Sequence, residues 1–330
     1  MSYQNKKVLV TGGAGFVGSN LVNHLVEAGA EVTVLDDLFT GRKSNIKYIN
    51  DIRFIQGTVT DYELVATLVK GADIVFNLAV RNIIVSTKSP LLDFQVNTGG
   101  TFNVLVAAKN FGIERVVYAS SASVYGNPRI IPIPEEEHLS TLSPYAASKL
   151  AGENYCQAFY ESYGLPVVVL RYSNVYGVNQ SPSNPYSGVI SKFFYNLMNN
   201  RSPQVHGDGE QTRDFTYVDD AVDATMRAGL SLKAEGEVFN VSSGKETSIN
   251  DLVEKISLVT ETSIPPVYID RRDIDNIRRR VLNTEKIRRV LRWIPNTTLR
   301  IGLDKTYQWL LEDTKMETKK PRIHIMNRMG

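Results

Sequence analysis

The stretch 7-KVLVTGGAGFVG-18 joins a short apolar run to a cluster of glycines. A helical pattern follows from about Phe16 to Glu27, and the β-branched segment Glu31–Leu35 comes next. Strand, glycine loop, helix and second strand within about thirty residues make a βαβ unit. The glycines permit a tight turn and let backbone N–H groups approach a pyrophosphate at the helix N-terminus. A purely structural glycine-rich turn is the alternative.

An acidic pair follows the second strand. Asp36 lies 21 residues after Gly15, and Asp37 comes directly after it. A carboxylate at this place can hold the adenosine ribose hydroxyls of a dinucleotide. Because an acid repels a 2′-phosphate, the pattern favours NAD over NADP, although Arg42 and Lys43 stand nearby.

Apolar strands and helical patterns keep alternating through the first half of the chain. Strands are predicted at 53–56, 73–78, 115–119 and 166–171, and helices at 62–69, 91–110 and 143–163. Continuous apolar strands that alternate with helices indicate a parallel sheet covered on both sides. We therefore predict an α/β fold whose residues 1–173 form a Rossmann-type, doubly wound parallel sheet.

The regular alternation of apolar strands and helices ends near residue 173, and residues 174–314 predict a smaller C-terminal α/β substrate lobe. The segment 176–187 is rich in Gly, Pro, Ser and Asn and reads as a loop. Helices are predicted at 188–199, 218–230, 248–260, 283–291 and 300–313, and strands at 213–217, 238–241 and 266–269. Segments around 213–241 are candidates to return to the main sheet. Residues 315–330 are basic and predict a flexible tail.

Composition sets the broad class. The chain has 330 residues, of which 42% are hydrophobic and 22% are charged, and its net charge is +2. This balance is ordinary for a soluble globular protein and does not indicate a nucleic-acid binder. The one cysteine, Cys156, and four scattered histidines predict neither a disulfide nor a metal site. No apolar run reaches the roughly 18–20 residues of a membrane span, and the early first strand leaves no room for a signal peptide. We expect a cytoplasmic protein.

Two further stretches carry chemistry. Tyr145 and Lys149 stand four residues apart, on one face of a helix that Ser143 can cap. An ammonium beside a phenol should lower the tyrosine pKa from about 10 toward neutral, which makes a general base or acid. The serines of 120–123 follow a strand of the sheet, where their hydroxyls can bond a substrate hydroxyl. Taken alone, a solvated helix face and a serine-rich turn are the alternatives.

Together these features resemble the extended short-chain dehydrogenase/reductases. Within them the chain is most similar to the NAD-dependent nucleotide-sugar epimerase/dehydratase family and its UDP-glucose 4-epimerase-like members. The resemblance spans about residues 6–313 and rests on the glycine loop, Asp36, Asn97, Ser121, Tyr145, Lys149 and the stretches 171–177, 207–220, 291–295 and 302–303.

The resemblance implies a mechanism and a cofactor site. Tyr145 would take the proton of a sugar hydroxyl while the hydride passes to NAD. Ser121 would bond that oxygen, and Lys149 would also bind the nicotinamide ribose. The implied cofactor contacts are Gly12, Gly15, Phe16, Val17, Gly18, Asp36, Asp37, Thr58, Val59, Leu78, Ala79, Val80, Asn97, Tyr145, Lys149 and Tyr172.

The same resemblance implies a nucleotide-sugar site, with a UDP-linked substrate, and a homodimer that pairs the helices 91–110 and 143–163. Arg213 and Arg272 would clamp the diphosphate, and Asp275 would hold a ribose. The full set of implied substrate contacts is Ser121, Ser123, Asn174, Gly188, Val189, Lys192, Gln204, His206, Arg213, Arg272 and Asp275.

The residues before Val124 discriminate between reactions. Family 4,6-dehydratases carry adjacent Asp and Glu there, and family decarboxylases carry a Glu, whereas this chain has Ala122 and Ser123. C4 epimerisation of the UDP-glucose/UDP-galactose type is therefore favoured. A dehydratase, decarboxylase or oxidoreductase of the same family remains an alternative, as does a non-catalytic NAD-binding regulatory protein. An N-acetylated or uronic sugar also stays open.

Three departures from the family pattern stand out. The segment 80–86 differs from the usual loop, and its Arg81 is a candidate to meet a cofactor phosphate or an acidic sugar, or to form a surface salt bridge. Ser173 replaces a common phenylalanine and leaves room near the nicotinamide. Thr58 stands where an aspartate often meets the adenine.

Overall fold

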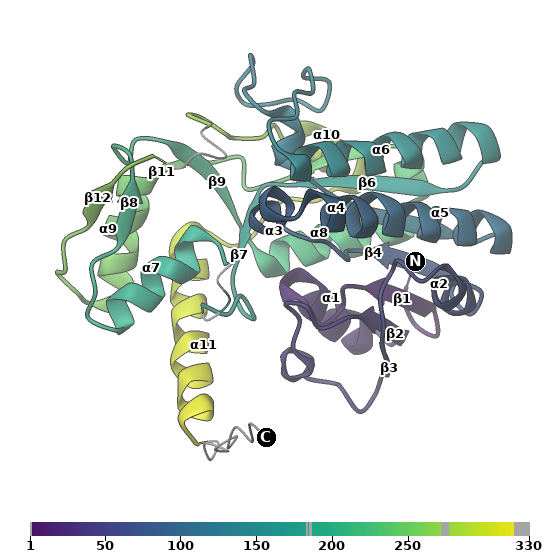
Figure 1. Cartoon of the computed structure of the whole chain (residues 1–330), viewed down its shortest axis with the longest axis horizontal. Helices are drawn as coiled ribbons and strands as arrows, with labels where there is room; N and C mark the ends of the chain where they lie inside the picture. Colours follow the sequence, from purple (N-terminus) through teal and green to yellow (C-terminus); the bar gives the residue numbers. More distant parts are fainter. Residues whose placement is uncertain (1, 183, 185–186, 272–276, 320–330) are drawn as a thin grey trace, which may run out of the picture.

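A seven-stranded parallel sheet forms the centre of the protein (Figure 1). The computed structural model describes residues 2–182, 184, 187–271 and 277–319, with side chains up to residue 313. The strands follow the order β10-β6-β5-β4-β1-β2-β3, and every neighbouring pair is parallel. They are β1 (Lys7–Thr11), β2 (Glu31–Asp36), β3 (Arg53–Gln56), β4 (Ile74–Asn77), β5 (Arg115–Ser121), β6 (Val167–Tyr172) and β10 (Val238–Val241). The chain order reverses between β1 and β4, which is where doubly wound sheets bind ligands.

Helices cover both faces of this sheet. One face carries α2 (Tyr62–Val69), α5 (Gly100–Phe111) and α6 (Pro144–Tyr163), and the other carries α1 (Phe16–Glu27), α8 (Val218–Leu230) and α10 (Glu285–Leu291). Successive strand residues point to opposite faces. Leu9 therefore joins the apolar cluster of the first face, and Val8 and Val10 join that of the second. This double burial explains why the strands are apolar on both sides.

A smaller lobe lies beside the main sheet (Figure 1). Its three-stranded sheet has the order β11-β9-β7, and β8 pairs with β12 in a separate parallel ladder. The strands are β7 (Asn174–Tyr176), β8 (Gln204–His206), β9 (Thr212–Tyr217), β11 (Glu246–Ser248) and β12 (Val267–Ile269). The lobe's helices are α7 (Val189–Met198), α9 (Ile249–Thr260) and α11 (Leu299–Lys319).

The predicted fold class is confirmed, with differences in detail. Of the segments expected near 213–241, β10 joins the main sheet next to β6, whereas β9 pairs with β7 and β11 in the lobe. The predicted helix 91–110 consists of α4 (Pro90–Asp93), a wider π-type segment η2 (Phe94–Gly99) and α5. Helix α11 continues to Lys319, beyond the start predicted for the tail, and residues 320–330 lie outside the described chain.

Other short elements were not predicted. They are α3 (Ile83–Lys88), the 3₁₀ turns η1 (Lys43–Asn45), η3 (Ala122–Tyr125) and η4 (Leu232–Ala234), and the lobe strands β7, β8 and β11, whereas β12 matches the strand predicted at 266–269. Segments this short show too few repeats for a periodic pattern to be recognised. Among the residues described, no helix combines the length and apolarity that a bilayer span requires.

Candidate functional site

A cleft of about 330 Å³ opens beside the glycine loop, and we call it the glycine-loop cleft. It lies where β1, β2, β4 and β5 end, at the edge of the sheet that parallel α/β folds use for ligands. All the predicted cofactor contacts except Asn97 line it: Gly12, Gly15, Phe16, Val17, Gly18, Asp36, Asp37, Thr58, Val59, Leu78, Ala79, Val80, Tyr145, Lys149 and Tyr172.

The glycine loop leaves space that larger residues would fill. Gly12 has a φ of +71°, and a Cβ there would lie 2.8 Å from the backbone nitrogen of Ala79. A Cβ on Gly18 would lie 2.1 Å from the carbonyl oxygen of Gly12. The first N–H groups of α1, which begins after Gly15, have no partner within the helix and favour an anion. This cradle fits the pyrophosphate of a dinucleotide.

Asp36 is held at the end of β2 by backbone donors. Its carboxylate accepts hydrogen bonds from the N–H groups of Ala14, at 2.9 Å, and Leu38, at 2.8 Å. Burial raises the pKa of Asp36 above its usual range, against the lowering effect of these bonds. The carboxylate thus ties the glycine loop to the segment after β2 and lines the cleft where a ribose is expected.

Tyr145 and Lys149 lie on the first turns of α6. As predicted, Ser143 caps this helix, because its hydroxyl accepts from the N–H of Ala146 at 3.2 Å. Lys149 is buried and donates through Nζ to the carbonyl of Ala119 at 2.7 Å. Burial lowers the pKa of Lys149 to about 8, and the nearby Asp93 carboxylate opposes that shift. At neutral pH the ammonium therefore keeps most of its charge on the wall that it shares with Tyr145.

Ser121 ends β5 and lines the same cleft. Its hydroxyl accepts from the N–H of Ser123 and donates to the Ser123 hydroxyl, both at 3.2 Å. Ser123, predicted as a substrate contact, lines neither of the two clefts; its N–H and its hydroxyl both bond the Ser121 hydroxyl. Ala122 is buried.

A buried network that sequence reasoning missed supports these residues from below. Glu153, one turn after Lys149, accepts from the Ser120 hydroxyl and forms an ion pair with Arg171, whose Nη2 lies 2.7 Å from Oε2. Arg171 also donates to the Tyr125 hydroxyl at 2.9 Å. The network joins β5, β6 and α6 directly beneath Ser121 and Lys149. The sequence indicates this network only through the four-residue spacing of Lys149 and Glu153.

Asn97 lies behind the cleft wall. Its side-chain oxygen accepts from the N–H of Arg81 at 2.7 Å, and its side-chain nitrogen donates to the Arg81 carbonyl at 3.0 Å. Asn97 is itself fully buried. The structure thus shows it fixing the loop after β4, and shows no wall contact of the kind that the resemblance implies.

A second cleft of about 290 Å³ lies in the smaller lobe, and we call it the arginine cleft. Ser187 lines both clefts, so the two adjoin. Arg271, Arg278 and Gln211 line it as well. The predicted substrate contacts in its wall are Asn174, Gly188, Val189, Lys192, Gln204, His206 and Arg213. The predicted contacts Arg272 and Asp275 lie outside the described residues.

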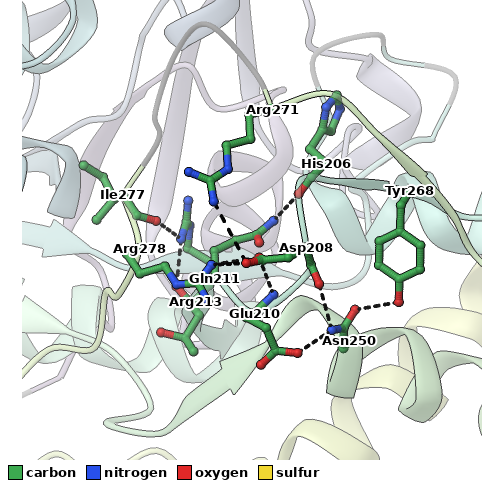
Figure 2. A network of polar contacts seen from close by, with 11 residues as sticks. His206, Asp208, Glu210, Gln211, Arg213, Asn250, Tyr268, Arg271, Ile277 and Arg278 are labelled. Carbon is green, nitrogen blue, oxygen red and sulfur yellow. Dashed lines mark hydrogen bonds and ion pairs between the residues drawn. The ribbon is translucent and has the colours of Figure 1, made fainter.

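Figure 2 shows how the arginines of this cleft are held. Arg213 is buried and donates through Nη1 to the carbonyls of Thr212 and Ile277, at 2.8 Å each. Asp208 accepts from Arg278 at 2.8 Å, and Arg271 comes within 4.0 Å of the same carboxylate. Guanidinium groups fixed in this way match the oxygens of a diphosphate.

Carboxylates are confined to one part of the two walls. Of the described residues that line either cleft, the acids are Asp36 and Asp37, which lie at the end of β2. Among the described residues, no carboxylate lines the wall beside Ser121 and Tyr145. The arginine cleft therefore suits an anionic ligand, and the glycine-loop cleft offers a hydroxyl, a phenol and an ammonium at its inner end.

Comparison with known proteins agrees with this arrangement. An epimerase of Methanothermobacter thermautotrophicus superposes with a TM-score of 0.93 at 38% identity, over 96% of each chain. The UDP-glucose 4-epimerase of Mycolicibacterium smegmatis is 36% identical over 309 residues, which cover 92% of this chain and 98% of that protein. The UDP-N-acetyl-alpha-D-glucosaminuronate decarboxylase of Bacillus cytotoxicus is 33% identical over 319 residues, covering 93% and 98%.

The sequence model of the NAD dependent epimerase/dehydratase family matches residues 8–242. That span includes the glycine loop, Asp36 and the start of α6, so the dinucleotide that the cradle fits is NAD. The chain belongs to this family of NAD-dependent enzymes.

Proposed function

We propose that the protein is a UDP-sugar 4-epimerase that interconverts a pair of the UDP-glucose/UDP-galactose type. Residues 1–173 would hold NAD, and residues 174–314 would hold the nucleotide. The observation that carries the proposal is the wall shared by Ser121 and Tyr145. It adjoins the arginine cleft, and no described residue places a carboxylate beside it. Elimination of water or loss of CO₂ calls for a further acid or base there, whereas 4-epimerisation does not.

Each catalytic residue has a role that its position supports. NAD supplies a hydride acceptor that returns the hydride within the same turnover. Tyr145 accepts the proton of the sugar 4-hydroxyl and later gives it back. Lys149 stabilises the phenolate with its charge, and Ser121 bonds the reacting oxygen from the end of β5.

The arginine cleft would orient the sugar. Arg213 and Lys192 line the wall that would face the diphosphate, while Gln204 and His206 line the part assigned to the nucleoside. Once its diphosphate is held there, the sugar ring can turn while its anchor stays fixed. A turned ring exposes the other face of C4 to the hydride, which is what inversion requires.

The test is direct. Purified protein is incubated separately with UDP-glucose, UDP-N-acetylglucosamine and UDP-glucuronate, and the products are followed by NMR. We expect the C4 epimer of at least one of these sugars, with no net change in NAD. Loss of the 6-oxygen or release of CO₂ would show a dehydratase or a decarboxylase instead. Bound NAD without turnover of any sugar would favour the regulatory alternative.

We further propose that the protein forms a homodimer through α4, η2, α5 and α6. These elements carry large exposed apolar side chains: Leu91 is 69% exposed, Phe94 60% and Tyr155 40%. The rings of Phe102 and Tyr155 meet edge to face at 5.1 Å. We call these four residues the aromatic face. A second copy of the chain is the proposed occupant, because exposed apolar faces of this kind mark interaction sites.

A further inference from the structure

Asp93 is a buried carboxylate behind the catalytic wall. It ends α4, directly before the π-type segment η2, and only 3% of its surface is exposed. It lines neither cleft. Burying an anion is costly unless hydrogen bonds and a nearby cation compensate it. A cation that balances the charge of Asp93 is therefore expected close by.

Three neutral groups hold this carboxylate in place. Its Oδ1 atom accepts from the Ser86 hydroxyl, from the Asn97 side-chain nitrogen at 2.5 Å and from the Ser148 hydroxyl at 3.1 Å. These donors belong to α3, η2 and α6, so Asp93 lies where the three elements meet. Because none of the donors is charged, the bonds orient the carboxylate and leave its negative charge in place.

Lys149 is the cation next to this cluster. It follows Ser148 on α6, and its side chain is buried. Burial raises the pKa of Asp93, and its hydrogen bonds and the charge of Lys149 oppose this rise. The carboxylate and the ammonium therefore stabilise one another's charged forms.

Arg81 is a second buried cation near the cluster, since Asn97 bonds its backbone. Its guanidinium is already used, because Nη2 forms an ion pair with Asp37 at 2.5 Å. The salt bridge that the sequence left open for Arg81 thus exists, and it lies in the wall of the glycine-loop cleft. Arg81 therefore balances Asp37, and Lys149 balances Asp93.

Asp93 differs from the other anion that acts on Lys149. Glu153 is held by Arg171, whose Nη2 lies 2.7 Å from Oε2, so its charge is compensated directly. Among the described residues, Asp93 has no such ion pair. Burial lowers the pKa of Lys149 to about 8, and of the charges that oppose this shift Asp93 acts more strongly than Glu153.

The other titratable groups at Lys149 are Cys156 and Tyr145 of the same helix and Tyr118 of β5. The Lys149 Nζ atom lies 5.0 Å from the centroid of the Tyr118 ring. Burial raises the pKa of Tyr118 and of the Cys156 thiol, so both groups stay neutral at neutral pH. Neither of them can replace the negative charge of Asp93.

We propose that Asp93 is a positioning residue for proton transfer: its buried negative charge keeps Lys149 in the ammonium form beside Tyr145. Opposite charges in a buried site attract strongly, because little water screens them. Asp93 acts through Lys149 and does not reach the wall of either cleft. The proposal rests on Tyr145 and Lys149 as the proton-transfer pair of the proposed function, and it does not depend on which sugar is converted.

The experiment titrates Lys149 directly by NMR. Holoprotein is isotope-labelled at the lysine ε-carbon, and the Lys149 signal is the one that is absent from Lys149→Met. The signal is followed with pH in the parent and in Asp93→Asn, which removes the charge and keeps an oxygen that can accept the same bonds. Asp51→Asn is the matched control, because Asp51 is exposed and lines neither cleft. Circular dichroism checks the fold.

Two further variants separate charge from hydrogen bonding. Ser148→Ala removes one hydrogen bond to Asp93 and keeps the negative charge, so Lys149 should titrate as in the parent. Asp93→Ala removes the bonds as well as the charge, and it should shift the titration of Lys149 in the same direction as Asp93→Asn.

In Asp93→Asn we expect Lys149 to titrate about one pH unit lower, the lower end of the effect of one nearby opposite charge. The fall in turnover that a neutral Lys149 causes should move to lower pH by the same amount. Asp51→Asn should match the parent in both measurements.

An unchanged titration of Lys149 in folded Asp93→Asn would overturn the proposal, as would an equal shift in Ser148→Ala. A parent protein that epimerises none of the sugars would refute the proposed function alone. The NMR titration needs no turnover, so it still decides whether Asp93 holds the charge of Lys149.

Discussion

Lys149 shows how burial sets the chemistry of a single residue. In the unfolded chain its pKa is 10.5, and in the fold burial lowers the pKa to about 8. Below pH 8 the ammonium is charged in both states, so the cost of burying its charge is fully present. As pH rises from about 8 toward 10.5 the folded chain loses the proton first, and that cost is relieved. Deprotonation of Lys149 therefore stabilises the folded state, but it removes the positive charge that would stabilise the Tyr145 phenolate.

The turnover rate should therefore fall as pH rises through about 8, because a neutral Lys149 no longer stabilises the Tyr145 phenolate. Initial rates measured at saturating nucleotide sugar, from about pH 6 to pH 10, would show this decline in turnover at high pH. Circular dichroism at each pH confirms that the protein stays folded. A rate that stays level up to about pH 10 would contradict the assigned role of Lys149.

Tyr145→Phe removes the phenolic oxygen and keeps the ring. We expect turnover to drop by about 10²- to 10⁴-fold, the usual contribution of a positioned acid or base. Binding of NAD should change little. Tyr163→Phe on the same helix is the matched control, because Tyr163 is exposed and does not line either cleft. Unchanged turnover by Tyr145→Phe would require another proton acceptor.

At the scale of the elements, α6 links the catalytic wall to the sheet. Tyr145, Lys149 and Glu153 follow one another at four-residue spacing, so they share one face of the helix. Tyr145 and Lys149 line the cleft, while Glu153 forms the ion pair with Arg171 of β6. The buried charge pair thus ties α6 to β6, and the bond from Ser120 to Glu153 ties α6 to the end of β5.

Glu153→Ala should lower the free energy of unfolding by about 3–5 kcal/mol, because it leaves the buried guanidinium of Arg171 without its partner. Urea denaturation at a fixed NAD concentration measures the change. Glu161→Ala, an exposed substitution on the same helix, should shift stability by less than about 1 kcal/mol. Equal small effects from both variants would mean that Arg171 finds another acceptor.

At the scale of the whole molecule, two clefts with different chemistry adjoin. The main sheet supplies hydroxyl, phenol and ammonium, and the smaller lobe supplies guanidinium groups. The polypeptide passes from β6 of the main sheet directly into β7 of the lobe, so the two walls are fixed relative to one another over a short stretch. The aromatic face, on α4, η2, α5 and α6, lines neither cleft.

Phe94→Glu should convert the proposed dimer into monomers, because a carboxylate would be buried without a partner in the contact between copies. Light scattering coupled to size-exclusion chromatography gives the mass. Leu258→Glu serves as control, since Leu258 is 66% exposed on α9, away from the aromatic face. A parent protein that elutes as a monomer, or a Phe94→Glu variant that remains dimeric, would contradict this interface.

Local patterns in the sequence determined the family, the cofactor and most of the elements. The glycine loop, Asp36 and the Tyr145–Lys149 pair are recognised by their spacing along the chain, which can be read from the sequence alone. The helix cap at Ser143 and the strand β10 were predicted for the same reason. From Ala122 and Ser123 the sequence predicted that no carboxylate stands before Val124. In the structure, Asp36 and Asp37 are the acids among the described residues of the cleft walls.

Only the tertiary structure decided the long-range contacts. Arg81 with Asp37, Asn97 with Arg81, and Glu153 with Arg171 join residues 44, 16 and 18 positions apart. The register of the sheet brings these residues together, and no local spacing encodes that register. The same is true of the hydrogen bonds between Ser123 and Ser121, and of β9, which pairs outside the main sheet. Burial and hydrogen-bond partners depend on the whole packed chain, because they are set by residues that are distant in sequence.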